Sequence, residues 1–361
     1  LDFLSKYLKK IEVEAESRVN CLTVALPESK CSNPRCDHLT WIENPEEVKV
    51  PEFENIDSIE KIVKIAESFH CKRNKIYKGI DMEKMFGLVQ PLCELQAMVG
   101  LTGVKTKIVE QILYFIKNLS DEKNRDMMHT VITGPPGTGK TTFARILGKI
   151  YSKLGLLSKG HFVEVSREDL VGKYLGHTAP QTNKTIDKCK GGIMFIDEVY
   201  SLGHSEKKDS FSKECIDVLN QQLSENRDLL CIIAGYQEDI EKCFFSQNKG
   251  LKRRFPFVYD IEGYSSEEML EIFKQKMNRD NWEIEDGLLN QFVKRFDKKI
   301  FQYFGGDIET FVFKTKIVFA QRHFYQTEKR INKETLEKAF TLFENSRKNV
   351  NEDPPYPHMY I

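Results

Sequence analysis

The loop from Gly134 to Thr142 constrains the fold of this chain more than any other part of its sequence. It satisfies the pattern G-x-x-x-x-G-K-[ST] and reads Gly134, Pro135, Pro136, Gly137, Thr138, Gly139, Lys140, Thr141, Thr142. An apolar stretch at residues 130–133 precedes the loop, and a helical pattern begins near Lys140. A phosphate-binding loop needs this position between a strand and a helix. The sequence therefore predicts a strand–loop–helix unit that binds the phosphates of a nucleotide.

Each residue type in this loop has a physical reason to be there. Glycines let the main chain curl so that successive N–H groups point at phosphate oxygens, and the helix N-terminus adds partial positive charge. We expect the Lys140 ammonium to bind the β- and γ-phosphates and the Thr141 hydroxyl to bind Mg²⁺. A chance match in a glycine-rich loop is the alternative, and the flanking strand and helix argue against it.

A second motif follows the apolar stretch at residues 192–196, which ends in Asp197 and Glu198. An Asp–Glu pair at a strand end is on its own usually a turn or a helix cap. Downstream of a phosphate loop, however, Asp197 is placed to hold Mg²⁺ through its waters. Glu198 would then act as general base and polarise the water that attacks the γ-phosphate.

Short apolar stretches alternate with helical patterns through the middle of the chain. This alternation predicts a parallel sheet covered on both faces. The expected strands are Thr130–Thr133, Phe162–Val165, Ile193–Ile196, Leu229–Ala234 and Phe257–Ile261. Ser166 with Asp169 is typical of a helix start, as is the capping box of Ser265 with Glu268. Beyond Gly263 only helical periodicity continues, which predicts an all-helical C-terminal domain.

Composition excludes some classes of protein. Lys and Arg total 54, and Asp and Glu total 54, so the chain lacks the cationic excess that coating nucleic acid or an anionic membrane requires. No apolar stretch approaches the ~20 residues of a membrane-spanning helix. The nine cysteines are scattered, which favours reduced thiols in the cytoplasm. Cys31, Cys36 and His38 have spacing that suits zinc, or they belong to a turn with free thiols.

The motifs together resemble an AAA+ ATPase, and more narrowly the CbxX/CfqX branch that includes the red-type Rubisco activases. The stretches that carry the resemblance are the phosphate loop and residues 170–180, 197–202, 234–236 and 250–255. The resemblance covers about residues 95–347 and leaves out the N-terminal stretch. It implies an α/β core with a five-stranded parallel sheet, a helical lid domain and assembly into a ring, commonly a hexamer.

The resemblance also assigns roles to two further groups of residues. Arginines from a neighbouring subunit complete the ATP site in this family; the matching positions are Arg253 and Arg254, and the family's Arg–Phe pair favours Arg254. Two solvated cations are the alternative. In such rings an aromatic pore loop contacts an extended protein chain. The alternative for this chain is that Tyr174 simply packs on the protein surface. The matching pore-loop residues are Lys173, Tyr174, Leu175 and Gly176.

Two departures from the family pattern bear on hydrolysis. The family generally places a polar residue after the fourth strand to position the attacking water, whereas the stretch at residues 234–236 offers only the Tyr236 hydroxyl or the backbone. The lid usually contributes an arginine from a Gly-Asn-x-Arg pattern, but residues 305–309 have no arginine at the matching position. We therefore expect hydrolysis that is slow or differently coupled to the lid.

These inferences predict four segments: a partly helical accessory segment at 1–75, the α/β nucleotide-binding domain at 76–262, the helical lid at 263–350 and a proline-rich tail at 351–361. The expected protein is a cytoplasmic, homo-oligomeric ATPase that remodels an unidentified protein client, with no nucleic-acid or membrane partner. A nucleotide-gated scaffold with slow turnover is the first alternative. A nucleic-acid motor or clamp loader is a weaker one, and a small-molecule kinase the weakest.

Overall fold

The computed structural model describes residues 46–47, 49–69, 75–76, 80–117, 127–203, 210–248 and 250–348. The internal contacts of the chain divide it into two compact units. The first takes its described residues from Leu1–Ala97, Lys105–Arg125 and Lys149–Leu156, and the second from Met98–Val104, Asp126–Gly148 and Leu157–Ile361. The four segments expected from the sequence follow motifs rather than contacts, and their boundaries stay predictions.

The first unit is helical around a small apolar core. Its elements are β1 (Glu46–Glu47), α2 (Ile59–Ala66), β2 (Lys75–Ile76), α3 (Met82–Gly87), α4 (Val89–Ala97) and most of α5 (Thr102–Ile116). The periodic apolar residues of α2 are buried, as the sequence pattern predicts. Strands β1 and β2 pair in parallel over two residues. Residues 1–45 of the expected accessory segment, including the group Cys31, Cys36 and His38, lie outside the described residues.

The second unit contains a five-stranded parallel sheet, which confirms the predicted fold class. The strands are β3 (Thr130–Thr133), β4 (Phe162–Val165), β5 (Ile193–Ile196), β6 (Leu230–Gly235) and β7 (Phe257–Asp260). Their order in the sheet is β4-β5-β6-β3-β7, with every neighbouring pair parallel. Strands β3, β5 and β6 are buried along their whole length. Such continuous burial is expected of a parallel sheet with helices on both faces.

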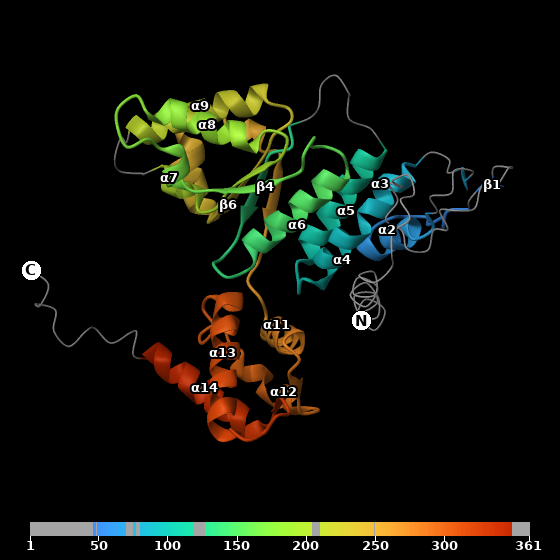
Figure 1. Ribbon diagram of the computed structural model, residues 1–361, viewed down its shortest axis with the longest axis vertical. Helices are drawn as coiled ribbons and strands as arrows, with labels where there is room; N and C mark the ends of the chain where they lie inside the picture. Colours follow the sequence, from blue (N-terminus) through green and yellow to red (C-terminus); the bar gives the residue numbers. More distant parts are fainter. Residues whose placement is uncertain are drawn as a thin grey trace, which may run out of the picture. The chain divides into compact units, whose positions relative to one another are not determined.

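Two helices of the α/β part, α6 (Lys140–Lys153) and α7 (Arg167–Leu170), start where the sequence predicts, at Lys140 and directly after Ser166. The next two are α8 (Thr178–Cys189) and α9 (Ser210–Glu225). Ser166 and Asp169 form the expected capping box at the start of α7. Helices α8 and α9 lie side by side (Figure 1). Short helical turns connect the last strands: η2 (Val199–Leu202), α10 (Gln237–Asp239), η3 (Ile240–Phe244), η4 (Phe245–Gln247) and η5 (Lys252–Arg254).

The C-terminal domain is helical, with a core made largely of phenylalanine. Its elements are α11 (Ser266–Arg279), β8 (Glu283–Ile284), α12 (Leu288–Phe292), η6 (Val293–Arg295), α13 (Phe304–Arg322), β9 (Arg330–Ile331) and α14 (Lys333–Lys348). Ser265 and Glu268 form the predicted capping box of α11. The sequence did not predict the parallel pairing of β8 with β9, because two residues are too few for a periodic pattern. Helices α13 and α14 run beside each other (Figure 1).

The helices and the cysteines of the described residues bear on two further expectations from the sequence. None of their helices is long and apolar enough to cross a membrane. Their five cysteines, Cys93, Cys189, Cys215, Cys231 and Cys243, are free thiols. Burial raises the pKa of both Cys189 and Cys215 to about 11, so these two thiols stay protonated and unreactive at neutral pH.

A buried histidine joins three elements of the core. His129 directly precedes β3 and is 3% exposed. Its Nδ1 accepts a hydrogen bond from the main-chain N–H of Cys231 at 3.1 Å, and its Nε2 lies 3.1 Å from the carbonyl oxygen of Leu223. Because Nδ1 is the acceptor, the proton must be on Nε2, and the ring is neutral. Burial is the main cause that lowers its pKa from 6.5 to about 4.

This histidine should make the fold less stable in acid. The unfolded chain takes up a proton near pH 6.5 and the folded chain only near pH 4, so the free energy of unfolding falls as the pH drops through that window. Between pH 7 and pH 5 the loss should be on the order of 2 kcal/mol. Urea unfolding of wild type and His129→Gln at both pH values measures it. An equal pH dependence in the two proteins would contradict this prediction.

Candidate functional site

The loop after β3 folds tightly enough to require glycine at two positions. Gly134 has φ 149° and Gly137 has φ 72°, which is the half of conformational space that glycine enters at little cost. A Cβ on Gly134 would lie 2.3 Å from the carbonyl oxygen of Ile261, and one on Gly137 would lie 1.9 Å from that of Tyr303. The positive φ angles and the close approach of neighbouring carbonyl oxygens thus both explain why glycine occupies these two positions. The loop curls as the sequence pattern predicts.

Lys140 stands at the start of α6 with its ammonium folded over the loop. Its Nζ donates to the carbonyl oxygens of Gly134 at 3.0 Å and Pro135 at 2.9 Å. Among the described residues no carboxylate forms an ion pair with it. Burial lowers the pKa of Lys140, while the nearby charges of Asp197 and Glu198 oppose that shift. A half-buried cation that donates to two carbonyl oxygens and to no carboxylate of the described residues suits an anionic ligand such as phosphate.

The structure brings the two expected metal ligands together. The Thr141 hydroxyl donates to Oδ2 of Asp197 at 3.0 Å, and the main-chain N–H of Glu198 donates to Oδ1 of the same carboxylate at 3.0 Å. A hydroxyl and a carboxylate are hard oxygen ligands of the kind that Mg²⁺ prefers, alongside waters and phosphate oxygens. The described residues contain no group of three or more metal-binding side chains. The hydroxyl and carboxylate of this donor pair fit Mg²⁺.

Glu198 follows Asp197 on a left-handed turn. Its φ is 49° and its ψ is 46°, a conformation that costs a residue with a side chain ~1–2 kcal/mol. The turn begins η2, where the N–H of Ser201 donates to the carbonyl oxygen of Glu198 at 2.8 Å. Glu198 is exposed to solvent. A strained residue with an exposed acid beside a phosphate loop is suited to catalysis.

The helical C-terminal domain reaches the loop through its main chain and a tyrosine. The N–H of Gly305, in the first turn of α13, donates to the carbonyl oxygen of Gly137 at 2.9 Å. The Tyr264 hydroxyl donates to the carbonyl oxygen of Thr138 at 2.7 Å. The sequence analysis missed Tyr264, although its place directly before the capping residue Ser265 marks the start of the domain. No arginine of the described lid makes this contact.

An acid occupies the position at which the family pattern has a lid arginine. When Gly-Asn-x-Arg is laid on residues 306–309, Glu309 takes the place of the arginine, and it forms an ion pair with Lys276 at 2.6 Å. Asp307 takes the place of the asparagine. It is 4% exposed and forms an ion pair with Arg347 of α14, and its Oδ2 also accepts from the main-chain N–H of Tyr303 at 2.8 Å. No local pattern pointed to Arg347, which is forty residues away from Asp307 along the chain.

The two arginines of η5 have different surroundings. Arg253 is exposed and has no hydrogen bond or ion pair among the described residues. Arg254 is half-buried; its Nε donates to the Ser224 hydroxyl at 2.5 Å and its Nη1 to the carbonyl oxygen of Gly250 at 2.6 Å. Neither contacts the phosphate loop of its own chain within the described ranges. Both roles predicted for them depend on a second subunit.

The expected pore loop presents two apolar side chains to solvent. Tyr174 is 68% exposed and Leu175 is 83% exposed. The base of the loop is closed, because the N–H of Gly172 donates to the hydroxyl of buried Thr178 at 3.2 Å. The loop reverses at Gly176, which has φ 76° and open space around it. A closed base with a bare apolar tip is the arrangement that the pore-loop hypothesis needs.

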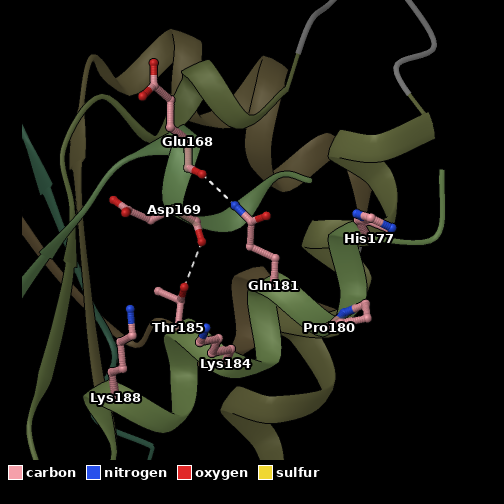
Figure 2. Close-up of a pocket in the computed structure, with 8 residues that line it drawn as sticks. All are labelled: Glu168, Asp169, His177, Pro180, Gln181, Lys184, Thr185 and Lys188. Carbon is pink, nitrogen blue, oxygen red and sulfur yellow. Dashed lines mark hydrogen bonds between the residues drawn. The ribbon is translucent and has the colours of Figure 1, made fainter. Parts of the chain in front are cut away.

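A cavity of about 600 Å³ lies between α7 and α8, next to this loop (Figure 2). The Gln181 amide donates to the carbonyl oxygen of Glu168 at 2.6 Å, and the Thr185 hydroxyl to that of Asp169 at 2.7 Å. Hydrogen bonds from Ser166 lower the pKa of the Asp169 carboxyl and keep it engaged at the helix start. The other lining residues are His177, Pro180, Lys184 and Lys188. None of the predicted nucleotide-binding residues lines this cavity.

The family described as "ATPase family associated with various cellular activities (AAA)" matches residues 130–253. The chain is 39% identical over 337 residues to putative cfxQ-like protein R730 of Acanthamoeba polyphaga mimivirus, covering 90% of this chain and 82% of that protein. It is 34% identical over 250 residues to a CfxQ homolog of Pyropia yezoensis, covering 67% and 83%. It is 36% identical over 193 residues to CbbX of Cereibacter sphaeroides, covering 52% and 62%.

Solved structures share the fold. RuvB of Thermotoga maritima, described as a Holliday junction branch migration motor, superposes with a TM-score of 0.50 at 18% identity over 69% of this chain and 71% of that one. The AAA domain of FIGL-1 in complex with ADP also gives 0.50 at 18% identity, over 68% and 83%. At this identity the likeness concerns the fold alone.

Removal of the Lys140 ammonium should abolish tight ATP binding. Its hydrogen bonds to phosphate are charge-assisted, and two of them are worth about 3–4 kcal/mol, so Lys140→Ala should weaken the affinity at least about 100-fold. Fluorescence titration with an ATP analogue measures the affinity. Lys184→Ala, which removes the same charge at the cavity beside α8, is the matched control and should bind normally. Equal ATP affinity of Lys140→Ala and wild type would disprove phosphate binding by Lys140.

Proposed function

Because this chain belongs to the CfxQ family of AAA ATPases, we propose that it binds ATP with Mg²⁺, hydrolyses it in a homo-oligomeric ring and uses the cycle to remodel another protein. The observation that carries the proposal is the convergence of Lys140, Thr141 and Asp197 at one end of the sheet. A cation without an acidic partner among the described residues lies there beside a hydroxyl–carboxylate pair 3.0 Å apart. Free thiols in the described chain support a reducing compartment such as the cytoplasm.

Each residue of the site would have a separate role in ATP hydrolysis. Main-chain N–H groups of the loop and Lys140 would hold the phosphates, while Thr141 and Asp197 would hold Mg²⁺, which supplies charge neutralisation on the phosphate oxygens. Glu198 would accept a proton from water as the water oxygen bonds to the γ-phosphorus. The bond from phosphorus to the bridging oxygen then breaks and leaves ADP and phosphate. General-base assistance of this kind is worth about 10²–10⁴ in rate.

Arg254 is the arginine that we propose to act on a neighbouring subunit's ATP. Its bonds to Ser224 and Gly250 fix the guanidinium while Nη2 stays available, and a fixed donor loses little freedom when it meets developing charge. Arg253 lacks such support within the described ranges. An arginine supplied in this way can raise the rate about 10³–10⁵-fold. The site is then complete only between two copies of the chain, which is the reason to propose a ring.

Two inactive variants should restore each other if the arginine acts across subunits. Glu198→Gln lacks the base and keeps Arg254, whereas Arg254→Ala lacks the arginine and keeps the base. Each alone should lose at least about 100-fold in ATPase rate, and their mixture should regain measurable phosphate release. Arg253→Ala is the matched control and should stay within a few-fold of wild type. A mixture as inactive as its components would refute action across subunits.

The loop with Tyr174 and Leu175 is the proposed contact with a client protein. Exposed apolar side chains on a closed loop can hold an extended chain without sequence selectivity, because apolar contact is non-directional. The neutral net charge of the chain does not favour nucleic acid as the client. RuvB is described as a Holliday junction branch migration motor, but at 18% identity its likeness to this chain extends to the fold only.

Client engagement should depend on Tyr174. In the Glu198→Gln background with ATP, a slowly hydrolysing ring should retain bound client, and Tyr174→Ala should reduce the amount of a denatured model protein, such as unfolded casein, that co-elutes with the ring. Tyr325→Ala is the matched control, since Tyr325 is a 95% exposed tyrosine on the turn after α13. Equal loss in both variants would contradict a specific role of the loop.

A nucleotide-gated scaffold is the second candidate, and Glu309 favours it. A carboxylate paired with Lys276 stands where the family pattern places a lid arginine. Hydrolysis without that arginine would be slow, so ATP binding rather than turnover would set the assembled state. Single-turnover hydrolysis by the assembled protein separates the two candidates.

A further inference from the structure

The chain that leaves β6 lies between the two halves of the site. Strand β6 is flanked by β3, which leads into the phosphate loop, and by β5, which leads into Asp197 and Glu198. Because the carboxyl ends of parallel strands meet at one edge of a sheet, this part of the chain passes beside both motifs. Tyr236 is the first residue after β6, and its backbone is extended. Its side chain is therefore placed next to the phosphate loop by the topology of the sheet.

The Lys140 ammonium lies over the ring of Tyr236. The distance from Nζ to the centre of the ring is 5.7 Å. A cation and an aromatic face attract each other within about 6 Å, and the attraction grows when the cation is withdrawn from water. Lys140 is half-buried and has no ion pair with a carboxylate among the described residues. The electron-rich face of Tyr236 is thus the aromatic contact of this cation in the described part of the chain.

A second ring packs against Tyr236. The rings of Tyr200 and Tyr236 lie 5.9 Å apart between centres and are tilted by 31°. Tyr200 in turn rests on Gly235, where an added Cβ would lie 3.0 Å from its Cδ1 and 3.1 Å from its Cε1. The glycine at the end of β6 therefore lets the Tyr200 ring approach the strand closely. Ring pairs at such a separation are attractive beyond the area that they bury, so Tyr200 restrains the Tyr236 ring.

Phosphate binding requires Lys140 to redirect its hydrogen bonds. Its Nζ donates to the carbonyl oxygens of Gly134 at 3.0 Å and Pro135 at 2.9 Å, and phosphate oxygens compete for the same donors. A hydrogen bond acts along one N–H direction and is lost when that N–H turns away. The attraction of an aromatic face acts on the charge itself, so it persists while the individual N–H groups change partners.

We propose that Tyr236 is a positioning residue for Lys140, that the face of its ring holds the ammonium at the phosphate loop while the donors turn from carbonyl to phosphate oxygens, and that the ring of Tyr200 keeps Tyr236 in place. The inference rests on the proposed binding of ATP. It gives the residue after the fourth strand of the sheet a role that depends on its ring. The Tyr236 hydroxyl, the polar atom at this position, is not needed for it.

Two substitutions at Tyr236 separate its ring from its hydroxyl. Tyr236→Phe keeps the ring and should bind a fluorescent, non-hydrolysable ATP analogue within about twofold of wild type, whereas Tyr236→Leu should bind it about fivefold more weakly. Tyr325→Leu removes a 95% exposed ring on the turn after α13 and is the matched control, which should bind as wild type does. If Tyr236→Phe lost as much affinity as Tyr236→Leu, the hydroxyl would be the acting group and the proposal would be overturned.

Fluorine on the ring tests the electrostatic contact at nearly constant shape. Phenylalanine analogues with one, two and three ring fluorines at position 236 withdraw electron density from the face and weaken its attraction for a cation step by step. The affinity for the ATP analogue should fall with each fluorine, towards the affinity of Tyr236→Leu. A ring that served only to fill space would not respond, so equal affinities across the series would overturn the proposal.

The support by Tyr200 is tested with a double-mutant cycle. Tyr200→Leu should weaken binding of the analogue in the same direction as Tyr236→Leu, because Tyr236 loses the ring that restrains it. In the double variant the losses should not add, since Tyr200 acts on Lys140 only through Tyr236. Additive losses would refute the support by Tyr200.

The wild-type protein separates this inference from the proposed function. Binding of the analogue by wild type together with no response to fluorine would refute the role of Tyr236 while ATP binding stood. Failure of wild type to bind the analogue at all would refute ATP binding and, with it, the role of Tyr236.

Discussion

Parallel pairing in the order β5-β6-β3 is the constraint on which the site depends. It places three strand ends at one edge of the sheet, so residues that are 56 positions apart, Thr141 and Asp197, come within 3.0 Å. These three strands are buried along their whole length, so apolar packing on both faces of the sheet holds their ends in place. The chemistry is therefore positioned by the apolar core rather than by the polar residues themselves.

The charges at this edge are unbalanced in a way that favours a triphosphate with its metal. Lys140 donates to two carbonyl oxygens, while Asp197 and Glu198 are exposed and the Asp197 carboxylate accepts from the Thr141 hydroxyl and the Glu198 N–H. A polyanion with a divalent cation satisfies both signs at once, because phosphate oxygens meet the ammonium and Mg²⁺ meets the carboxylate. A triphosphate with Mg²⁺ thus accounts for the presence of both the cation and the carboxylates at this edge.

Local sequence patterns predicted much of this structure, but they could not predict interactions between residues that are far apart along the chain. The strands, the two capping boxes and the loop glycines follow from residues within a few positions of one another. Strand bounds differ from the prediction by one residue at β6 and β7. Tyr264, which bonds to Thr138 of the loop, and Arg347, which pairs with Asp307, act across more than thirty residues, and no periodic pattern encodes such contacts. Only the motif residues of the site were readable in advance.

The lid contacts the phosphate loop although it lacks an arginine at the position of the family pattern. Glu309 cannot replace an arginine at a phosphate, because two negative charges would repel each other. The ion pair of buried Asp307 with half-buried Arg347 instead ties α13 to α14, and the start of α13 then meets the loop through the N–H of Gly305. Any ligand that moves the Gly137 carbonyl must therefore break or carry along that hydrogen bond. The loop and the lid are thus joined by this main-chain hydrogen bond, which a side-chain substitution cannot remove, and by the bond of the Tyr264 hydroxyl to Thr138.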